Sequence, residues 1–119
     1  MTPARLEAHR RALVAAAVGA GEVALGSRAL LADWIGVHRS QITRAARGQT
    51  VGGELGWRLT ALAAVVTALL AIYEPDAVAG WLAGSNPHLA DRRPLDLLAM
   101  GDVASVMTAV QAARTGVFA

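Results

Sequence analysis

The chain has 119 residues, of which 55% are hydrophobic and 17% are charged, a composition that excludes a disordered tail. It contains no cysteine, which excludes a disulfide framework, a thiolate metal site and a cysteine nucleophile. Residues 1–58 carry eight arginines against four acidic residues (net +4), whereas residues 59–119 carry three against five (net −2). The opposite charges suggest that the two halves have different partners, and the basic amino-terminal half could bind phosphate. A net charge of +4 by itself also fits ordinary variation in surface charge.

The first predicted helix begins at Thr2-Pro3, where a capping residue precedes a proline at the first helical position. Leu6 and Leu13 lie on its apolar stripe, and Gly19-Ala20-Gly21 is predicted to end it. The next helix is predicted to bury Leu30. Charged residues interrupt the first segment where a signal peptide needs an apolar core, so we expect a cytoplasmic protein without a secretory leader.

Residues 28–47, predicted as two short helices, match the pattern of a helix-turn-helix. Ala32 is small where the helices would cross, and Gly36 supplies the turn. The apolar residues that would seal the contact are Leu31, Ile35, Val37, Ile42 and Ala45. The outward face is polar and basic, and its predicted DNA-binding residues are Arg28, His38, Arg39, Ser40, Thr43, Arg44 and Arg47. An ordinary helical hairpin with a solvated arginine face is the alternative.

Leu59–Tyr73 is a continuous apolar segment of 15 residues. As a helix it would span about 22 Å, short of the roughly 30 Å hydrocarbon core of a bilayer. We therefore predict a buried central helix and no contact with a membrane, and a small membrane-associated protein is the less favoured alternative. Because the segment is apolar on nearly all sides, a homodimer interface is expected to cover part of it.

Three further helices are predicted in the acidic half. They begin at Pro75, Pro94 and Asp102, which favour first helical turns, and a turn at Gly84-Ser85-Asn86-Pro87 separates the first two. Alternation of polar and apolar residues never extends far enough for a useful strand. The predicted fold class is therefore all-α.

The last third of the chain carries a recognisable motif. Its parts are Trp81-Leu82, Asn86-Pro87, Leu89, the run Arg92-Arg93-Pro94-Leu95-Asp96-Leu97-Leu98, Gly101 and Gly116-Val117-Phe118. In this pattern residues 81–119 resemble the carboxy-terminal toxin-binding domain of Xre/MbcA/ParS-like antitoxins. The resemblance implies an amino-terminal helix-turn-helix region (residues 1–56) followed by a small helical domain that binds the toxin and dimerises (residues 57–119).

The same resemblance implies a type II antitoxin with two partners. One is a RES-domain toxin that consumes NAD or uses it for ADP-ribosylation, and the antitoxin would cover its active-site cleft. The other is operator DNA, through which the complex would repress its own promoter. The toxin-binding residues implied are Trp81, Asn86, Arg92, Arg93, Asp96, Gly116, Val117, Phe118 and Ala119.

The chain terminus suggests how the cleft would be blocked. NAD carries a pyrophosphate, so its pocket should be electropositive, and a half with net −2 is complementary to it. Val117, Phe118 and the Ala119 carboxylate would then plug the cleft. The alternative is that Phe118 packs on its own core.

Signatures of catalysis are missing from the sequence. The three histidines fall on separate segments without metal-ligand spacing, and no serine lies in a nucleophile elbow. We therefore predict no enzymatic activity, no cofactor, no metal and no small-molecule substrate. The alternative function is a free-standing helix-turn-helix transcriptional regulator whose carboxy-terminal part only dimerises.

Overall fold

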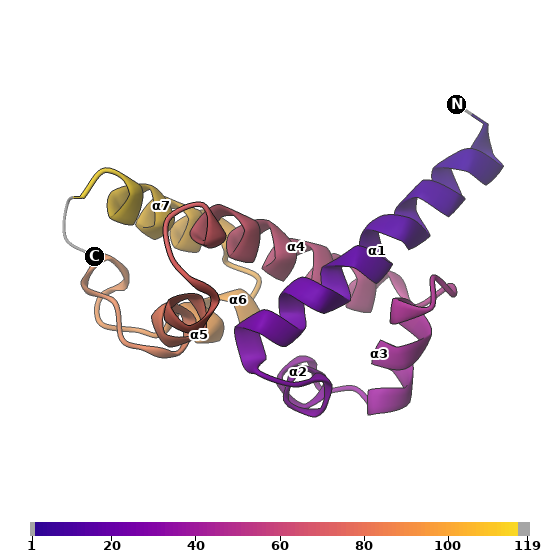
Figure 1. Cartoon of the computed structure of the whole chain (residues 1–119), viewed down its shortest axis with the longest axis horizontal. Helices are drawn as coiled ribbons and strands as arrows, with labels where there is room; N and C mark the ends of the chain where they lie inside the picture. The colour runs from indigo at the N-terminus through magenta and orange to yellow at the C-terminus, as the bar shows by residue number, and fades with distance from the viewer. Residues whose placement is uncertain (1, 117–119) are drawn as a thin grey trace.

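The computed structural model describes residues 2–116, and these fold as the predicted all-helical chain (Figure 1). The helices are α1 (Pro3–Leu25), α2 (Arg28–Ile35), α3 (Arg39–Ala46), α4 (Gly53–Leu70), α5 (Pro75–Ala83), the short 3-10 helix η1 (Pro87–Leu89), α6 (Pro94–Ala99) and α7 (Val103–Arg114). In Figure 1, α1 crosses α4, α7 lies along α4, and α2 and α3 pack against α1. The first turns of α1 extend away from the rest of the molecule.

The first helix is longer than predicted. It runs through Gly19-Ala20-Gly21 and ends at Gly26, whose φ is 98°. Gly21 is buried where α2 approaches, and a Cβ there would lie 2.8 Å from a methyl carbon of Leu31. A glycine inside a helix costs about 1 kcal/mol relative to alanine, which close packing of a neighbouring helix offsets. The predicted helix end is therefore wrong.

The buried face of α1 also begins later than predicted. Leu6 and Leu13, expected on the inner stripe, are 54% and 52% exposed because the start of the helix projects beyond the core. The buried residues of this helix are Val14, Ala17, Val18, Gly21 and Ala24. Only the second half of α1 therefore contributes to the core.

The predicted helical hairpin is formed by α2 and α3. Ser27 caps α2 by accepting a hydrogen bond from the Leu30 backbone N–H (3.1 Å), and Gly36 ends it with a φ of 88°. The residues of the hairpin that are fully buried are Leu31, Ile42 and Ala45. Leu30, predicted to be buried, is 52% exposed, because the side of α2 that faces the core is the one with Leu31.

The centre of the core is α4, which packs between α1 and α7. Its buried residues are Leu55, Gly56, Leu59, Leu62, Val65, Val66 and Leu69. Trp57 and Leu70 stay 50% and 42% exposed, so the two neighbours cover only part of this helix.

By length and composition alone, α4 is the single helix in the described part of the chain that could cross a membrane, and one third of it is buried inside the structure. Helices α1 and α2 have the length and composition of a membrane span only when they are taken together, and the angle between them is 96°. The core helix of a soluble protein has the same length and composition, so this is weak evidence for a membrane span.

A single hydrophobic cluster joins the two halves of the chain. It runs from Val14 of α1 through α4 to Val110 of α7. The indole N–H of Trp34 in α2 also donates a hydrogen bond to the carbonyl oxygen of Leu95 in α6 (3.3 Å). The predicted boundary between residues 56 and 57 falls inside α4, within this shared core.

Candidate functional site

The outward side of α3 carries the predicted DNA-reading residues. Those that are exposed are Arg39, Ser40, Arg44 and Arg47, and Thr43 is partly buried. His38 caps the helix, because its Nδ1 accepts a hydrogen bond from the Ser40 backbone N–H (3.1 Å) and lies 2.8 Å from Ser40 Oγ. Arg39 and Arg44 of α3 and Arg47 at its C-cap have no carboxylate within ion-pair distance among residues 2–116, so their charges face solvent.

Arg28 is held between two neighbouring helices. Its Nη2 donates a hydrogen bond to Glu22 Oε1 in α1 (3.1 Å), and its Nη1 donates to Thr43 Oγ1 in α3 (3.4 Å). These contacts fix the orientation of α3 against α1. The guanidinium predicted to approach phosphate therefore already serves to position the hairpin.

The segment between α5 and α6 is a hydrogen-bonded loop built around Asn86, which is 4% exposed. Its side-chain oxygen accepts from the His88 backbone N–H (2.9 Å). Its backbone carbonyl accepts from the N–H groups of Leu89 and Asp91 (2.9 Å each), and its own N–H donates to the carbonyl of Arg92 (3.1 Å). Asn86, predicted to bind toxin, is therefore the buried centre that shapes the loop.

Two consecutive residues of this loop adopt left-handed backbone conformations. Ala90 has a φ of 54° and Asp91 a φ of 62°, and both side chains are exposed. Such a conformation costs about 1–2 kcal/mol per non-glycine residue, and the hydrogen bonds of Asn86 hold it in place. The loop thereby presents Asp91 and Arg92 to solvent in a fixed position.

An exposed ion pair begins α6. Arg93 Nη2 lies 2.8 Å from Asp96 Oδ1, and Arg93 Nε lies 3.0 Å from Asp96 Oδ2, a two-point contact with both side chains about half exposed. The hydrogen bonds from Arg93 lower the pKa of the Asp96 carboxyl, and the same contact raises the pKa of Arg93. Both charges therefore stay fixed on the surface at neutral pH.

Asp102 caps the last helix of the described chain. Its carboxylate accepts a hydrogen bond from the Ser105 backbone N–H (3.0 Å). Hydrogen bonds from the Ser105 side chain and backbone lower the pKa of Asp102, and the charge of Arg92 lowers it further. This cap fixes the start of α7 close to the loop that carries Arg92.

Trp81 lies on α5 and is partly buried. Its indole N–H is shielded from solvent and has no hydrogen-bond partner among the described residues. An unpaired buried donor costs about 1–3 kcal/mol, so the ring is held here by its apolar contacts.

The predicted residues form two separate groups in the structure. Trp81, the Asn86–Arg92 loop and the Arg93–Asp96 pair come from α5 to α6, whereas the arginine face lies on α3 at the other side of the molecule (Figure 1). Gly116 is exposed just after α7, with a φ of 75°. The predicted plug, Val117, Phe118 and Ala119, lies outside the described residues.

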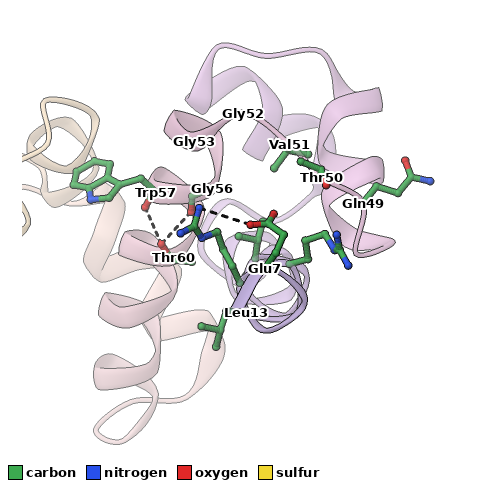
Figure 2. Close-up of a pocket in the computed structure, with 13 residues that line it drawn as sticks. Glu7, Leu13, Gln49, Thr50, Val51, Gly52, Gly53, Gly56, Trp57 and Thr60 are labelled. Carbon is green, nitrogen blue, oxygen red and sulfur yellow. Dashed lines mark hydrogen bonds and ion pairs between the residues drawn. The ribbon is translucent and has the colours of Figure 1, made fainter. Parts of the chain in front are cut away.

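A groove that the sequence did not predict lies beside α1, with a volume of about 540 Å³ (Figure 2). It is lined by the start of α1, the loop from Gln49 to Gly52 and the first two turns of α4. Its polar side includes Glu7, Arg10 and Arg11, and its apolar side includes Trp57. The groove arises from the angle at which α1 crosses α4, which no local sequence signal specifies.

Comparison with known proteins identifies the carboxy-terminal half. The family described as antitoxin Xre/MbcA/ParS C-terminal toxin-binding domain matches residues 61–116. These residues belong to that antitoxin family. The antitoxin domain thus begins inside α4 and includes α5, the Asn86 loop, α6 and α7.

The likeness to antitoxins extends beyond the matched domain. A chain of the crystal structure of the M. tuberculosis MbcT–MbcA toxin–antitoxin complex is similar to this one with a TM-score of 0.73 and 29% sequence identity. The similarity covers 88% of this chain and 96% of that chain, so it includes helices that precede residue 61. No curated protein matches the chain.

Within residues 2–116, no three histidine, aspartate or glutamate side chains come together as a metal site would require. The antitoxin domain presents charged and apolar side chains from a fixed loop and a helix start. Such an arrangement suits contact with another protein surface.

Proposed function

We propose that this antitoxin neutralises a RES-domain toxin that consumes NAD, and that it does so without enzymatic activity by covering the toxin's active-site cleft. The observation that carries the proposal is the family match of residues 61–116, the segment that folds into α5, the Asn86 loop, α6 and α7. An inhibitor of this kind needs a preformed surface, because ordering a flexible one on binding costs affinity. The hydrogen bonds of Asn86 supply that order.

The charge of the surface supports an electropositive partner. Residues 59–119 have a net charge of −2, and the exposed Glu74, Asp76 and Asp91 have no ion pair among residues 2–116. A cleft that binds the pyrophosphate of NAD carries positive charge, so the two surfaces are complementary. Val117, Phe118 and Ala119 are the residues proposed to enter the cleft.

Repression of its own promoter is the second part of the proposal. The exposed Arg39 and Arg44 of α3 and Arg47 at its C-cap carry unneutralised charge, and the hairpin has the buried contacts that a helix-turn-helix needs. Operator DNA is the proposed ligand of this face. We further propose a cytoplasmic homodimer, in which Trp57 and Leu70, both half exposed on α4, lie at or near the contact between copies.

Co-expression with a candidate RES-domain toxin tests the toxin part. The full chain should rescue growth, preserve cellular NAD and co-purify with the toxin as a stable complex. The double variant Arg93→Glu/Asp96→Arg keeps the ion pair but exchanges its two charges, so it should fold normally and lose rescue. Arg39→Gln on α3 is the matched control and should rescue fully.

Truncation of residues 116–119 tests the plug separately. Loss of inhibition with retained co-purification is the expected result, because the rest of the surface still binds. Full inhibition by the truncated chain contradicts the plug and leaves the antitoxin proposal standing.

A free-standing transcriptional regulator is the second candidate. It is favoured by the same arginine face on α3, which does not depend on a toxin. It requires operator binding by the chain alone and no complex with the RES-domain protein, so the co-purification experiment separates the two.

A further inference from the structure

The amino-terminal turns of α1 carry positive charge that the fold does not use. Arg5, Arg10 and Arg11 lie on this segment with a single acidic residue, Glu7. Arg10 approaches Glu7 only to 3.9 Å and stays 76% exposed, and Arg5 and Arg11 have no ion pair among residues 2–116. Most of this charge, held out on a projecting helix, is therefore free to meet a ligand.

This charge lies close to the arginine face of α3. Arg10 and Arg11 line the groove beside α1, which is bounded by Thr50, Val51 and Gly52. The same three residues border a smaller hollow that is lined by Gln41 and Arg44 of α3. The hollow with Arg10 and Arg11 and the hollow with Arg44 therefore share one short loop, part of which Figure 2 shows beside the start of α1.

We propose that Arg10 and Arg11 extend the DNA interface of α3 by binding the phosphate backbone of the same duplex. This inference rests on the proposed binding of operator DNA by α3. A recognition helix in the major groove lies between phosphates on both sides, and the chain that follows it passes close to one strand. The arginines across the Gln49–Gly52 loop reach that strand.

The reach of α1 suits this contact. The projecting segment, residues 3–13, is about 16 Å long as a helix, which corresponds to the rise of about five base pairs along the duplex axis. Phosphate contacts of this kind position the protein and add affinity without reading sequence. The inference therefore assigns base reading to α3 and sequence-independent affinity to α1.

The test measures binding of the full chain to two 30-base-pair duplexes over a range of salt. One duplex comes from the DNA upstream of the chain's own coding sequence, and the other is its scrambled counterpart. Each lost phosphate contact lowers the slope of log K against log salt by about 0.9, which is about eightfold in affinity at 0.1 M salt. Arg11→Gln should therefore bind both duplexes about eightfold more weakly, and Arg10→Gln/Arg11→Gln about 60-fold.

Two variants serve as controls. Arg114→Gln removes the same charge from an exposed position at the end of α7 and should bind like the wild type. Arg11→Lys keeps the charge and should keep the slope. Helical content by circular dichroism checks that every variant folds.

Three outcomes overturn the inference. If Arg11→Gln matches Arg114→Gln in affinity and slope while Arg44→Gln weakens binding, α1 does not touch DNA although α3 does. If the wild type binds neither duplex, the proposed operator binding fails as well. Binding to phosphatidylserine vesicles is measured for the same variants. If the Arg10 and Arg11 variants bind both duplexes like the wild type and lose only vesicle binding, the basic segment serves a membrane surface instead.

Discussion

The guanidinium of Arg28 lies 3.1 Å from the carboxylate of Glu22, across the junction between α1 and α2. The same guanidinium donates to Thr43 of α3, so one side chain ties together three helices. The orientation of the arginine face on α3 therefore depends on Glu22, which lies outside the helix-turn-helix of residues 28–47.

Replacing either partner should loosen that junction. Arg28→Gln and Glu22→Gln should each lower the free energy of unfolding by about 0.5–1 kcal/mol, because the pair is only partly exposed. In urea unfolding, the double variant should lose little more than Arg28→Gln alone, since both changes remove the same contact. Additive losses would mean that the two side chains act independently.

Two glycines of α1 should respond oppositely to alanine. Gly19→Ala adds a Cβ with no atom within 4 Å and should stabilise the chain by up to about 1 kcal/mol through helix propensity. Gly21→Ala places a Cβ 2.8 Å from fully buried Leu31 and should be about 1–3 kcal/mol less stable than Gly19→Ala. Thermal unfolding of the pair measures the difference, and equal stabilities would contradict the close approach of α2.

These glycines also mark the limit of what the sequence can predict. The caps at Thr2 and Ser27, the turn at Gly36 and the all-helical class follow from local signals, because each depends on a few neighbouring residues. The continuation of α1 past Gly19-Ala20-Gly21 and the exposure of Leu6 and Leu13 depend on how α1 meets α2 and α4, which local spacing does not specify.

The candidate sites likewise combine features that the sequence predicts with features that depend on tertiary contacts. The run from Arg92 to Leu98 identified the antitoxin domain because residue identity carries the family pattern. The buried hydrogen bonds of Asn86 and the closeness of Arg11 to the loop beside Arg44 were not predictable, since they arise from tertiary contacts.

Asn86 should be important for both stability and toxin neutralisation. Asn86→Ala removes the acceptor of the His88 N–H in a buried position and should cost about 1–3 kcal/mol. Ser85→Ala, at the exposed neighbouring position, should change stability by less than about 0.5 kcal/mol. Denaturant unfolding and toxin co-purification of both variants check this, and equal effects would contradict the central place of Asn86 in the loop.

Removing the unpaired indole N–H should leave the fold intact. Trp81→Phe keeps an aromatic ring among the same apolar neighbours and deletes the buried donor, so the midpoint of unfolding should stay unchanged or rise. Trp81→Ala is the contrasting variant and should be destabilised by lost packing. A fall in stability for Trp81→Phe as large as for Trp81→Ala would show that the N–H has a partner in solution.

The cap of α7 should give stability that depends on pH. The folded-state pKa of Asp102 lies below its unfolded value of about 3.9, so its contribution is fully present above that value and is lost as the pH falls through the folded pKa. Asp102→Ala should therefore unfold at a lower temperature than the wild type at pH 7. The gap should close as the pH is lowered toward 2, and a gap that is constant with pH would exclude the carboxylate as its source.

The antitoxin domain starts within α4, and α1 of the amino-terminal region packs on the same helix. The proposed toxin binding and the proposed DNA binding therefore depend on one shared helix. Dividing the chain anywhere between residues 53 and 70 should give two insoluble fragments. Each fragment would expose leucines and valines of α4 that the other fragment covers in the intact chain. Exchange of toxin specificity between relatives would therefore have to transfer the loop and helix surfaces onto an intact α4, and could not be achieved by swapping whole modules.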